Sequence, residues 1–347
     1  MYPLKFKPVY KEKIWGGTAI KDRFNRSVEG DSIGESWEIA AHEEGNSKVA
    51  NGEFKGKPLA KVVNKTGVDL LGTKASEDDF KKFPLLIKLL DANDKLSVQV
   101  HPDDEHAAYH EGELGKTEMW YVIDAKEDAQ LIYGINPGVD QEEFRRSIKA
   151  GELGENLRKV DIKPGDVLYI PSGTVHAIME GILLAEIQQN SDTTYRVYDW
   201  NRMGKDGAPR ELHIDSALEV IDFDGEPQEK VEGLKIKKED IEKDILVACP
   251  YFITEKIELD GSYKTEANGE RFYIYMGLEG KTNLKYKDQE IDILAGETVL
   301  VPAALGEYEL KGESRLLCTY QKELEEFKQN LLNQGISPEE LDKIGGF

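Results

Sequence analysis

Short runs of apolar residues, separated by glycine, proline and acidic turns, recur along most of the chain and predict a mainly-β fold. Residues 95–100 alternate, with Leu96, Val98 and Val100 apolar and the residues between them polar. That period of two is typical of a strand with one buried face. Similar runs rich in branched and aromatic residues predict further strands at residues 33–39, 119–124, 167–170 and 182–188.

Helical patterns interrupt this β organisation. Pro102-Asp103-Asp104 opens a short predicted helix over residues 103–113, because proline and acidic residues favour the first turn of a helix. Apolar residues at helical spacing predict helical insertions at about 57–93 and 140–160, and a helical tail over residues 322–344. We therefore expect strands to form the framework and helices to be additions to it.

Matched segments indicate an internal repeat. Gly165–Pro171 (GDVLYIP) is echoed by Gly296–Pro302 (GETVLVP), and a second pair of segments upstream matches in the same order. The second copy has Glu307 where the first has His176, and it lacks a pair of histidines. We therefore expect two copies of one β unit, the second being degenerate and free of metal.

A charge-rich, weakly apolar connector at residues 230–243 suggests a domain boundary. We predict a first domain over residues 1–240, which includes the helical insertions. A second β domain, residues 241–347, ends in the helical tail. Each domain would contain one copy of the repeated unit.

The charge balance narrows the classes of partner. The chain of 347 residues carries a formal net charge of −22, which argues against nucleic acid and anionic membranes, since both need clustered Lys and Arg. No signal peptide or membrane span is evident, so a soluble, cytoplasmic protein is expected. The two cysteines, Cys249 and Cys318, lie far apart and predict neither a disulfide framework nor a cysteine metal site.

Polar side chains on one predicted strand suggest a metal site. Gln99 and His101 are two residues apart, so their side chains point to the same face of the strand. Taken alone, this pair also fits a polar ladder on a solvent face. His106 and His110 lie four apart on one helix face, and exposed polar residues are a better interpretation of them than a second metal site.

A second motif favours the metal interpretation. Gly165-x5-Pro171-x-Gly173-x2-His176 matches the second motif of the cupin family at every fixed position. In cupins this motif brings its histidine to the mouth of a β-barrel, where it binds one divalent metal with a histidine-bearing strand and a glutamate. By this resemblance Glu118 supplies the carboxylate. Two imidazoles, one carboxylate and one amide oxygen suit one Zn2+ per chain.

Longer stretches resemble the short bacterial form of type I phosphomannose isomerase. The matching stretches are residues 15–17, 34–38, 96–103, 115–121, 165–176 and 188–200. The last of them, QQNSDTTYRVYDW, is the most diagnostic. The resemblance extends along nearly the whole chain and implies two cupin-type jelly-roll units with helical insertions.

The resemblance also implies a reaction, the interconversion of mannose 6-phosphate and fructose 6-phosphate through an enediol. The zinc ligands that it implies are Gln99, His101, Glu118 and His176. Zinc bound there would polarise the substrate carbonyl as a Lewis acid.

Four further residues acquire roles by this resemblance. Arg196 maps to the catalytic arginine, which would stabilise the developing enediolate. Lys116 maps to an active-site lysine, which could equally be the catalytic base or a group that binds the phosphate or a hydroxyl of the substrate. A zinc-bound water is another candidate base. Ser97 and Lys88 map to residues near the substrate phosphate.

Other functions within the cupin group stay open. One is a related cupin isomerase or epimerase acting on another sugar, and another is a non-catalytic sugar-sensing cupin. Two departures from the general cupin pattern argue against an iron-dependent cupin oxygenase: Glu118 follows His101 by seventeen residues, and Glu180 replaces an asparagine. The expected partner is a small sugar phosphate, not nucleic acid or a membrane, and the protein is expected to be a monomer or homodimer.

Overall fold

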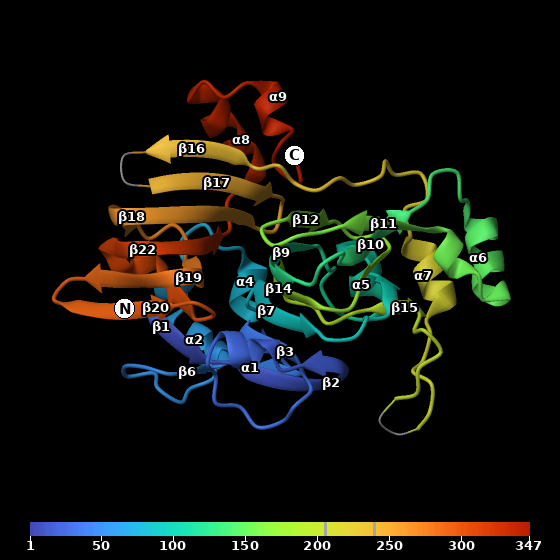
Figure 1. Cartoon of the computed structure of the whole chain (residues 1–347). Helices are drawn as coiled ribbons and strands as arrows, with labels where there is room; N and C mark the ends of the chain where they lie inside the picture. Colours follow the sequence, from blue (N-terminus) through green and yellow to red (C-terminus); the bar gives the residue numbers. More distant parts are fainter. Residues whose placement is uncertain (205–206, 239–240) are drawn as a thin grey trace. The chain divides into compact units, whose positions relative to one another are not determined.

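Strands dominate the computed structural model, which describes residues 1–204, 207–238 and 241–347 (Figure 1). The prediction of a mainly-β fold is confirmed. Among the described residues, none of the helices is long and apolar enough to cross a membrane.

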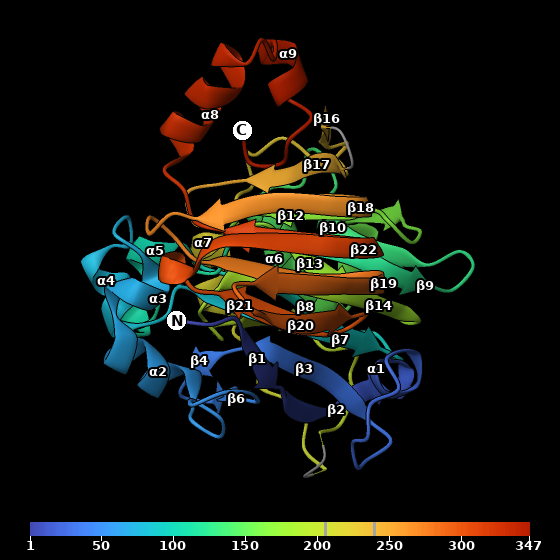
Figure 2. The ribbon, with the colours of Figure 1, turned by 90° about the vertical axis from the view of Figure 1, so that its left-hand side faces the viewer.

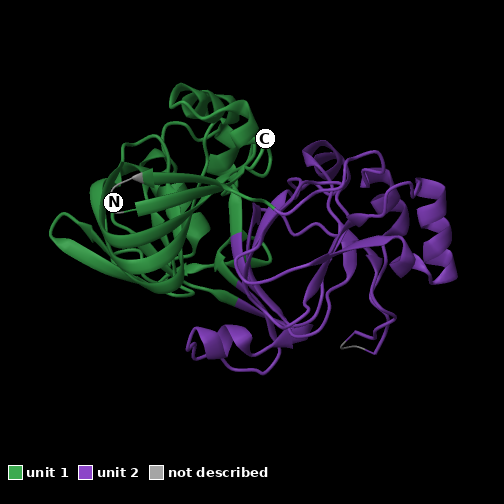
Figure 3. Cartoon of the chain, turned by 45° about the horizontal axis from the view of Figure 1, so that its top comes forward, with its two compact units in different colours: residues 1–9, 37–86, 231–347 green, residues 10–36, 87–230 purple. Residues whose placement is uncertain are grey.

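The chain folds into two compact units, each assembled from several segments of the sequence (Figure 3). Unit 1 holds residues 1–9, 37–86 and 231–347, and unit 2 holds residues 10–36 and 87–230. Unit 1 therefore draws on both ends of the chain. The predicted domains, residues 1–240 and 241–347, follow chain order instead and stay a prediction.

Unit 2 is a sandwich of two sheets that share an apolar core. A six-stranded sheet has the order β12 (Val167–Ile170), β9 (Glu118–Ala125), β14 (Ile182–Gln189), β7 (Leu85–Ala92), β3 (Ile33–Ile39), β2 (Val9–Gly17). A few terminal residues of β2, β3 and β7 are assigned to unit 1. A five-stranded sheet has the order β11 (Leu157–Asp161), β10 (Gln130–Ile135), β13 (His176–Ile178), β8 (Val98–Val100), β15 (Tyr195–Tyr198). Leu90 and Trp120 of the first sheet belong to the same buried cluster as Leu131 and Ile178 of the second. Two sheets packed in this way form the sandwich expected of a jelly roll.

Glycines in left-handed backbone explain the motif that carries His176. Gly165 has φ +92° before β12, and Gly173 has φ +86° in the turn before β13, conformations that favour glycine. The backbone N–H of Gly173 donates to the carbonyl oxygen of His101 at 2.9 Å. The turn is thereby tied to the segment that carries another predicted ligand.

Unit 1 contains a nine-stranded sheet. Its order is β16 (Leu234–Lys238), β17 (Ile241–Ala248), β18 (Ile253–Ala267), β22 (Gly306–Tyr320), β19 (Tyr273–Tyr286), β21 (Thr298–Val301), β1 (Leu4–Lys7), β6 (Lys48–Val49), with β20 (Gln289–Leu294) paired to β19. Figure 2 shows β17, β18, β22 and β19 side by side. β19 pairs antiparallel with β21 in unit 1 as β9 pairs with β12 in unit 2, which agrees with the predicted repeat.

Helices occupy the margins of both units. Unit 1 contains α2 (Leu59–Thr66), α3 (Val68–Leu71), α4 (Glu77–Lys81), α8 (Leu324–Asn333), α9 (Pro338–Leu341) and a short hairpin of β4 (Ala41–His42) and β5 (Gly45–Asn46). Unit 2 contains α1 (Ala19–Arg23), α5 (Asp104–His110), α6 (Gln141–Ala150) and α7 (Ile214–Val220). The helices predicted at 103–113 and in the C-terminal tail are confirmed.

Three segments were predicted wrongly in part. Within 57–93, residues 85–92 form the fully buried strand β7, since a short continuous apolar run suits a strand buried on both faces. Within 140–160, α6 ends at Gly151 in left-handed backbone, and residues 157–161 form a strand paired with β10. Residues 234–238 and 241–243 of the predicted connector form strands, because β16 and β17 pair with each other, and residues 239–240 lie outside the described residues.

Gly16 on β2 lies against β3 with no room for a side chain. A Cβ there would lie 2.4 Å from the backbone nitrogen of Gly34 and 2.4 Å from the carbonyl oxygen of Ser32. We expect Gly16→Ala to lower the free energy of unfolding by about 1–3 kcal/mol, because backbone atoms must move apart. Urea unfolding followed by tryptophan fluorescence measures this loss.

Gly154→Ala is the matched control for this prediction. A Cβ at Gly154 meets no atom within 4 Å beyond its chain neighbours, so the change in stability should be about 0.5 kcal/mol or less. Equal stability of the two variants would contradict the close approach of β2 and β3.

Candidate metal centre and active site

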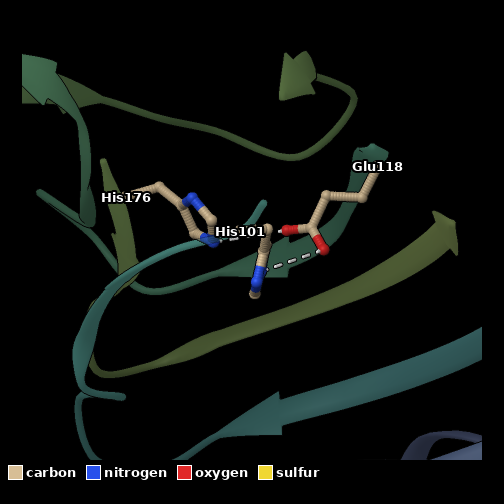
Figure 4. A group of neighbouring side chains, drawn as sticks. All are labelled: His101, Glu118 and His176. Atoms are coloured by element: carbon tan, nitrogen blue, oxygen red, sulfur yellow. Dashed lines mark ion pairs between the residues drawn. The ribbon is translucent and has the colours of Figure 1, made fainter. Parts of the chain in front are cut away.

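Two histidines and a glutamate from three separate segments meet in the interior of unit 2 (Figure 4). His101 directly follows β8, Glu118 begins β9 and His176 begins β13. His176 Nε2 lies 3.4 Å from Glu118 Oε1, and His101 Nε2 lies 3.6 Å from Glu118 Oε2. All three side chains are at most 1% exposed. Three of the residues predicted as metal ligands therefore face one centre.

The spacing of these atoms fits a four-coordinate zinc ion. Two ligand atoms about 2.1 Å from a tetrahedral centre lie about 3.4 Å apart. The distances from the Glu118 oxygens to the two imidazoles, 3.4 and 3.6 Å, agree with this value. Nitrogen and oxygen donors of these kinds also suit zinc.

Backbone carbonyls fix the orientation of both imidazoles. His101 Nδ1 lies 2.9 Å from the carbonyl oxygen of Thr193, and His176 Nδ1 lies 2.9 Å from that of Thr174. Because a carbonyl oxygen can only accept, each Nδ1 carries the proton and each Nε2 presents a lone pair to the centre. Burial lowers the pKa of His176 to about 4 and that of His101 well below its usual value, so both rings are neutral at pH 7.

Gln99, the fourth predicted ligand, lies beside the imidazole of His176. The two residues pair across β8 and β13, and Gln99 Nε2 is 3.3 Å from His176 Nε2. A half-turn of the terminal amide exchanges its nitrogen and oxygen and brings Oε1 to this position. The geometry is therefore compatible with an amide oxygen ligand, and this role of Gln99 stays a prediction.

The carboxylate of Glu118 is buried, and one lysine lies against it. Lys116 Nζ lies 2.8 Å from Glu118 Oε2 and 2.9 Å from His101 Nε2. Among the described residues, no donor makes a well-aligned hydrogen bond to either oxygen of Glu118. Burial raises the pKa of Glu118 to about 7, although the charge of Lys116 lowers it. A divalent cation would supply the charge and the bonds that these oxygens lack.

A second buried polar cluster lies on β7 and β14. Lys88 Nζ is 3.0 Å from Glu186 Oε1 and donates to Gln188 Oε1 at 2.6 Å. Trp120 Nε1 donates to Glu186 Oε2 at 3.1 Å. Burial opposes the charge on Lys88, but the carboxylate of Glu186 raises the pKa of Lys88 above its usual value, so the lysine is protonated. The sequence analysis missed Glu186, although polar residues two apart on an apolar strand signal a buried polar face.

Arg196 lies on β15 in register with Gln99 on β8. Its Nε donates to Ser97 Oγ at 3.3 Å, and its Nη1 donates to the carbonyl oxygen of Glu211 at 2.8 Å. Ser97, predicted near the substrate phosphate, thus holds the predicted catalytic arginine in place.

One cavity collects the predicted catalytic and substrate residues. Its volume is about 240 Å³, and its wall includes Lys88, Ser97, Gln99, Lys116 and Arg196. Five basic and three acidic side chains line it, although the whole chain is strongly acidic. The cavity therefore gathers the local positive charge that an anionic substrate needs. A larger open hollow of about 870 Å³ lies on unit 1, and no histidine is among the described residues that line it.

Arg210 also lines the cavity, and the sequence analysis missed it. Asp199 Oδ2 accepts a hydrogen bond from Arg210 Nε at 2.7 Å, and Asp199 Oδ1 accepts one from Arg202 Nη2 at 2.7 Å. Asp199 belongs to the diagnostic stretch 188–200, and the arginines that it binds follow that stretch in the sequence. Their position relative to the cavity depends on the folded loop, which a single sequence does not reveal.

Two family models match the chain. The catalytic domain of type I phosphomannose isomerase matches residues 3–131, and the cupin domain of mannose-6-phosphate isomerase matches residues 242–321. Mannose-6-phosphate isomerase ManA of Bacillus subtilis is 43% identical over 92% of this chain and 98% of that protein. The mannose-6-phosphate isomerase of Streptococcus mutans is 38% identical over 92% of this chain and 99% of that protein.

Solved structures agree with these matches. The crystal structure of mannose 6-phosphate isomerase from Bacillus subtilis has a TM-score of 0.86 at 40% identity, covering 92% of this chain and 99% of that one. A phosphomannose isomerase variant from Salmonella typhimurium, at 16% identity and a TM-score of 0.76, shows the same fold. These matches identify the fold as a cupin fold and the class of protein as an isomerase. At 43% identity over most of both sequences, the chain belongs to the type I phosphomannose isomerase family.

The ion pair between Lys88 and Glu186 is buried, so removing one partner leaves an uncompensated charge. We expect Lys88→Met and Glu186→Gln each to lower the free energy of unfolding by about 3–5 kcal/mol. The double variant should lose less than the sum of the two, since no unpaired charge then remains. Urea denaturation of the four proteins measures this coupling, and additive losses would contradict it.

Proposed function

We propose that this protein is a zinc-dependent aldose–ketose isomerase that interconverts mannose 6-phosphate and fructose 6-phosphate through an enediol. The observation that carries the proposal is the buried group His101, Glu118 and His176. Lys116, in contact with this group, lines the same cavity as Arg196. The relatives support the choice of substrate, because those from Bacillus subtilis and Streptococcus mutans are named mannose-6-phosphate isomerase.

The residues present fit a zinc ion, which would be held by His101, Glu118 and His176 with Gln99 as the fourth ligand. When bound, zinc supplies a Lewis acid that polarises the substrate carbonyl. The other tasks fall to side chains of the cavity wall. They bind the phosphosugar, move a proton between its C2 and C1, and stabilise the negative charge that develops on oxygen.

Two cavity side chains are candidates to move the proton. Glu186 is buried, which by itself raises its pKa, but the charge of Lys88 lowers that pKa below its usual value. Its carboxylate is therefore ionised and able to accept a proton, as a general base must. We assign proton transfer to Glu186, and to Lys116 the role of a cation that orients a substrate hydroxyl. Lys88 and Ser97 line the same cavity, and their role near the phosphate stays a prediction. Arg210 is a further cation of this cavity.

The pH dependence of kcat tests the assignment of proton transfer to Glu186. If Glu186 accepts the proton, kcat should hold nearly constant from about pH 8 to about pH 6, because its lowered pKa keeps the carboxylate ionised throughout. A kcat that falls steadily as the pH drops through this range, at constant zinc content, would contradict this assignment. Rates at saturating substrate, with zinc content checked at each pH, measure the dependence.

Arg196 gives the cavity a fixed positive charge beside the developing enediolate. We expect Arg196→Ala to lower kcat by about 10²–10³-fold, as removal of an oxyanion-stabilising donor does. Zinc content should stay near one per chain, because the hydrogen bonds of Arg196 run to Ser97 and to the carbonyl oxygen of Glu211 and not to the buried ligands. Arg145→Ala, which removes a partly exposed ion pair on α6, is the control and should leave kcat unchanged. Loss of zinc together with activity would contradict the electrostatic role.

The ligand assignment predicts the behaviour of the histidine variants. His101→Ala and His176→Ala should each lose zinc and activity together, because each removes one of the few ligands of the ion. His42→Asn is the control, since His42 belongs to unit 1 and not to the centre. Elemental analysis and turnover, measured on the same samples, test this. Full zinc and activity in either ligand variant would overturn the assignment.

The deciding experiment is a coupled assay for conversion of mannose 6-phosphate to fructose 6-phosphate, with and without a chelator. Activity that disappears with the chelator and returns with Zn2+ would support both substrate and metal. Turnover of another sugar phosphate, but not of mannose 6-phosphate, would indicate a related cupin isomerase. The cytoplasmic location and the monomeric or dimeric state stay predictions.

A further inference from the structure

A second group of metal-binding side chains lies on the outside of unit 2. His106 and His110 on α5 and Glu219 on α7 each offer a ligand atom, and these atoms all lie within 4.8 Å of one another. His106 is partly exposed, and His110 and Glu219 are exposed. The group shares no residue with the buried centre of His101, Glu118 and His176.

The fold holds the two imidazoles together. Residues four apart on a helix lie on the same face, and the rings of His106 and His110 are stacked with centroids 4.3 Å apart. Asp103 fixes the start of α5, since its side chain accepts a hydrogen bond from the backbone N–H of His106 at 2.8 Å. Tyr195 packs edge-on against the His106 ring, at 5.8 Å between centroids. The two imidazoles are thus held in place before any metal binds.

Glu219 is what distinguishes this group from an ordinary pair of surface histidines. It comes from a different helix, yet its carboxylate reaches the same point. Among the described residues, the ring nitrogens of His106 and His110 and the carboxylate oxygens of Glu219 form no hydrogen bond or ion pair. Three donor groups therefore converge, and within the part of the chain that the structure describes no protein group bonds to their lone pairs.

We propose that His106, His110 and Glu219 form a second, solvent-open site for a divalent transition metal, with zinc as its natural occupant. Two imidazole nitrogens and one carboxylate oxygen are the ligand types that zinc prefers, and solvent completes the fourth position. The net charge of −22 raises the local concentration of cations at the surface.

The geometry requires only a small adjustment. Ligand atoms of a tetrahedral zinc site lie about 3.4 Å apart, so these three atoms must approach by up to about 1.4 Å from separations of up to 4.8 Å. Rotation of the exposed side chains of His110 and Glu219 supplies that movement. An ion bound here would join α5 to α7 and stabilise the folded chain, since it binds only where both helices are in place.

Zinc stoichiometry tests the proposal. Protein dialysed to equilibrium against buffered micromolar Zn2+ should bind one more zinc per chain in the wild type than in the double variant His106→Ala, His110→Ala. His110→Ala alone should weaken this additional binding by at least about tenfold while leaving the fold intact, because its side chain is exposed. Tyr109→Ala is the matched control, since Tyr109 lies on the same helix with 85% exposure and is no ligand.

The outcomes are independent of the proposed isomerase chemistry. The difference between wild type and double variant counts only the outer zinc, whatever the buried centre holds, and circular dichroism verifies that the variant is folded. A wild type that binds one more zinc than the double variant, with Tyr109→Ala equal to wild type, would support the site. Equal zinc content in wild type and double variant would overturn it.

Discussion

The buried carboxylate of Glu118 is the constraint on which the site depends. A carboxylate removed from water loses several kcal/mol of hydration unless nearby charge or hydrogen bonds replace it. Around Glu118 the fold places two neutral imidazoles and one lysine, and none of these gives a well-aligned hydrogen bond to its oxygens. The arrangement becomes favourable once a divalent cation joins the three residues. The free-energy cost of burying this carboxylate therefore favours binding of a metal ion at the site.

The cations of the cavity are ordered before any substrate arrives. Lys88 is paired with Glu186, and Lys13 Nζ lies 2.7 Å from Glu35 Oε1. Such pairing fixes long side chains that would otherwise lose conformational freedom on binding a ligand. Lys116 differs, since the carboxylate beside it would be shared with a metal. Its charge would then be available to a phosphosugar, as is that of Arg196, whose hydrogen bonds run to the neutral hydroxyl of Ser97 and carbonyl of Glu211.

The sequence predicted the elements of the centre whose positions follow from local rules. The turn at Gly173 predicted His176, and the alternation of side chains along a strand predicted Gln99 and His101. Both signals act over a few residues and can be recognised in one sequence. Arg210 and the approach of Glu219 to α5 depend on loops and on packing between distant segments, which periodicity does not encode. The helix predicted at residues 157–160 was wrong for the same reason. Pairing with β10, and not the amino-acid composition of the segment, determines that these residues form a strand.

The composition of unit 1 from both chain ends has a consequence for dissection of the protein. β1 at the N-terminus pairs with β21, close to the C-terminal part of the sequence. A truncation of the gene near residue 230 would therefore remove β21, leave β1 paired only with β6, and expose an unpaired strand edge prone to aggregation. Removal of the N-terminal residues 1–7 would open the same sheet from the other side, because β21 would then lose its pairing with β1.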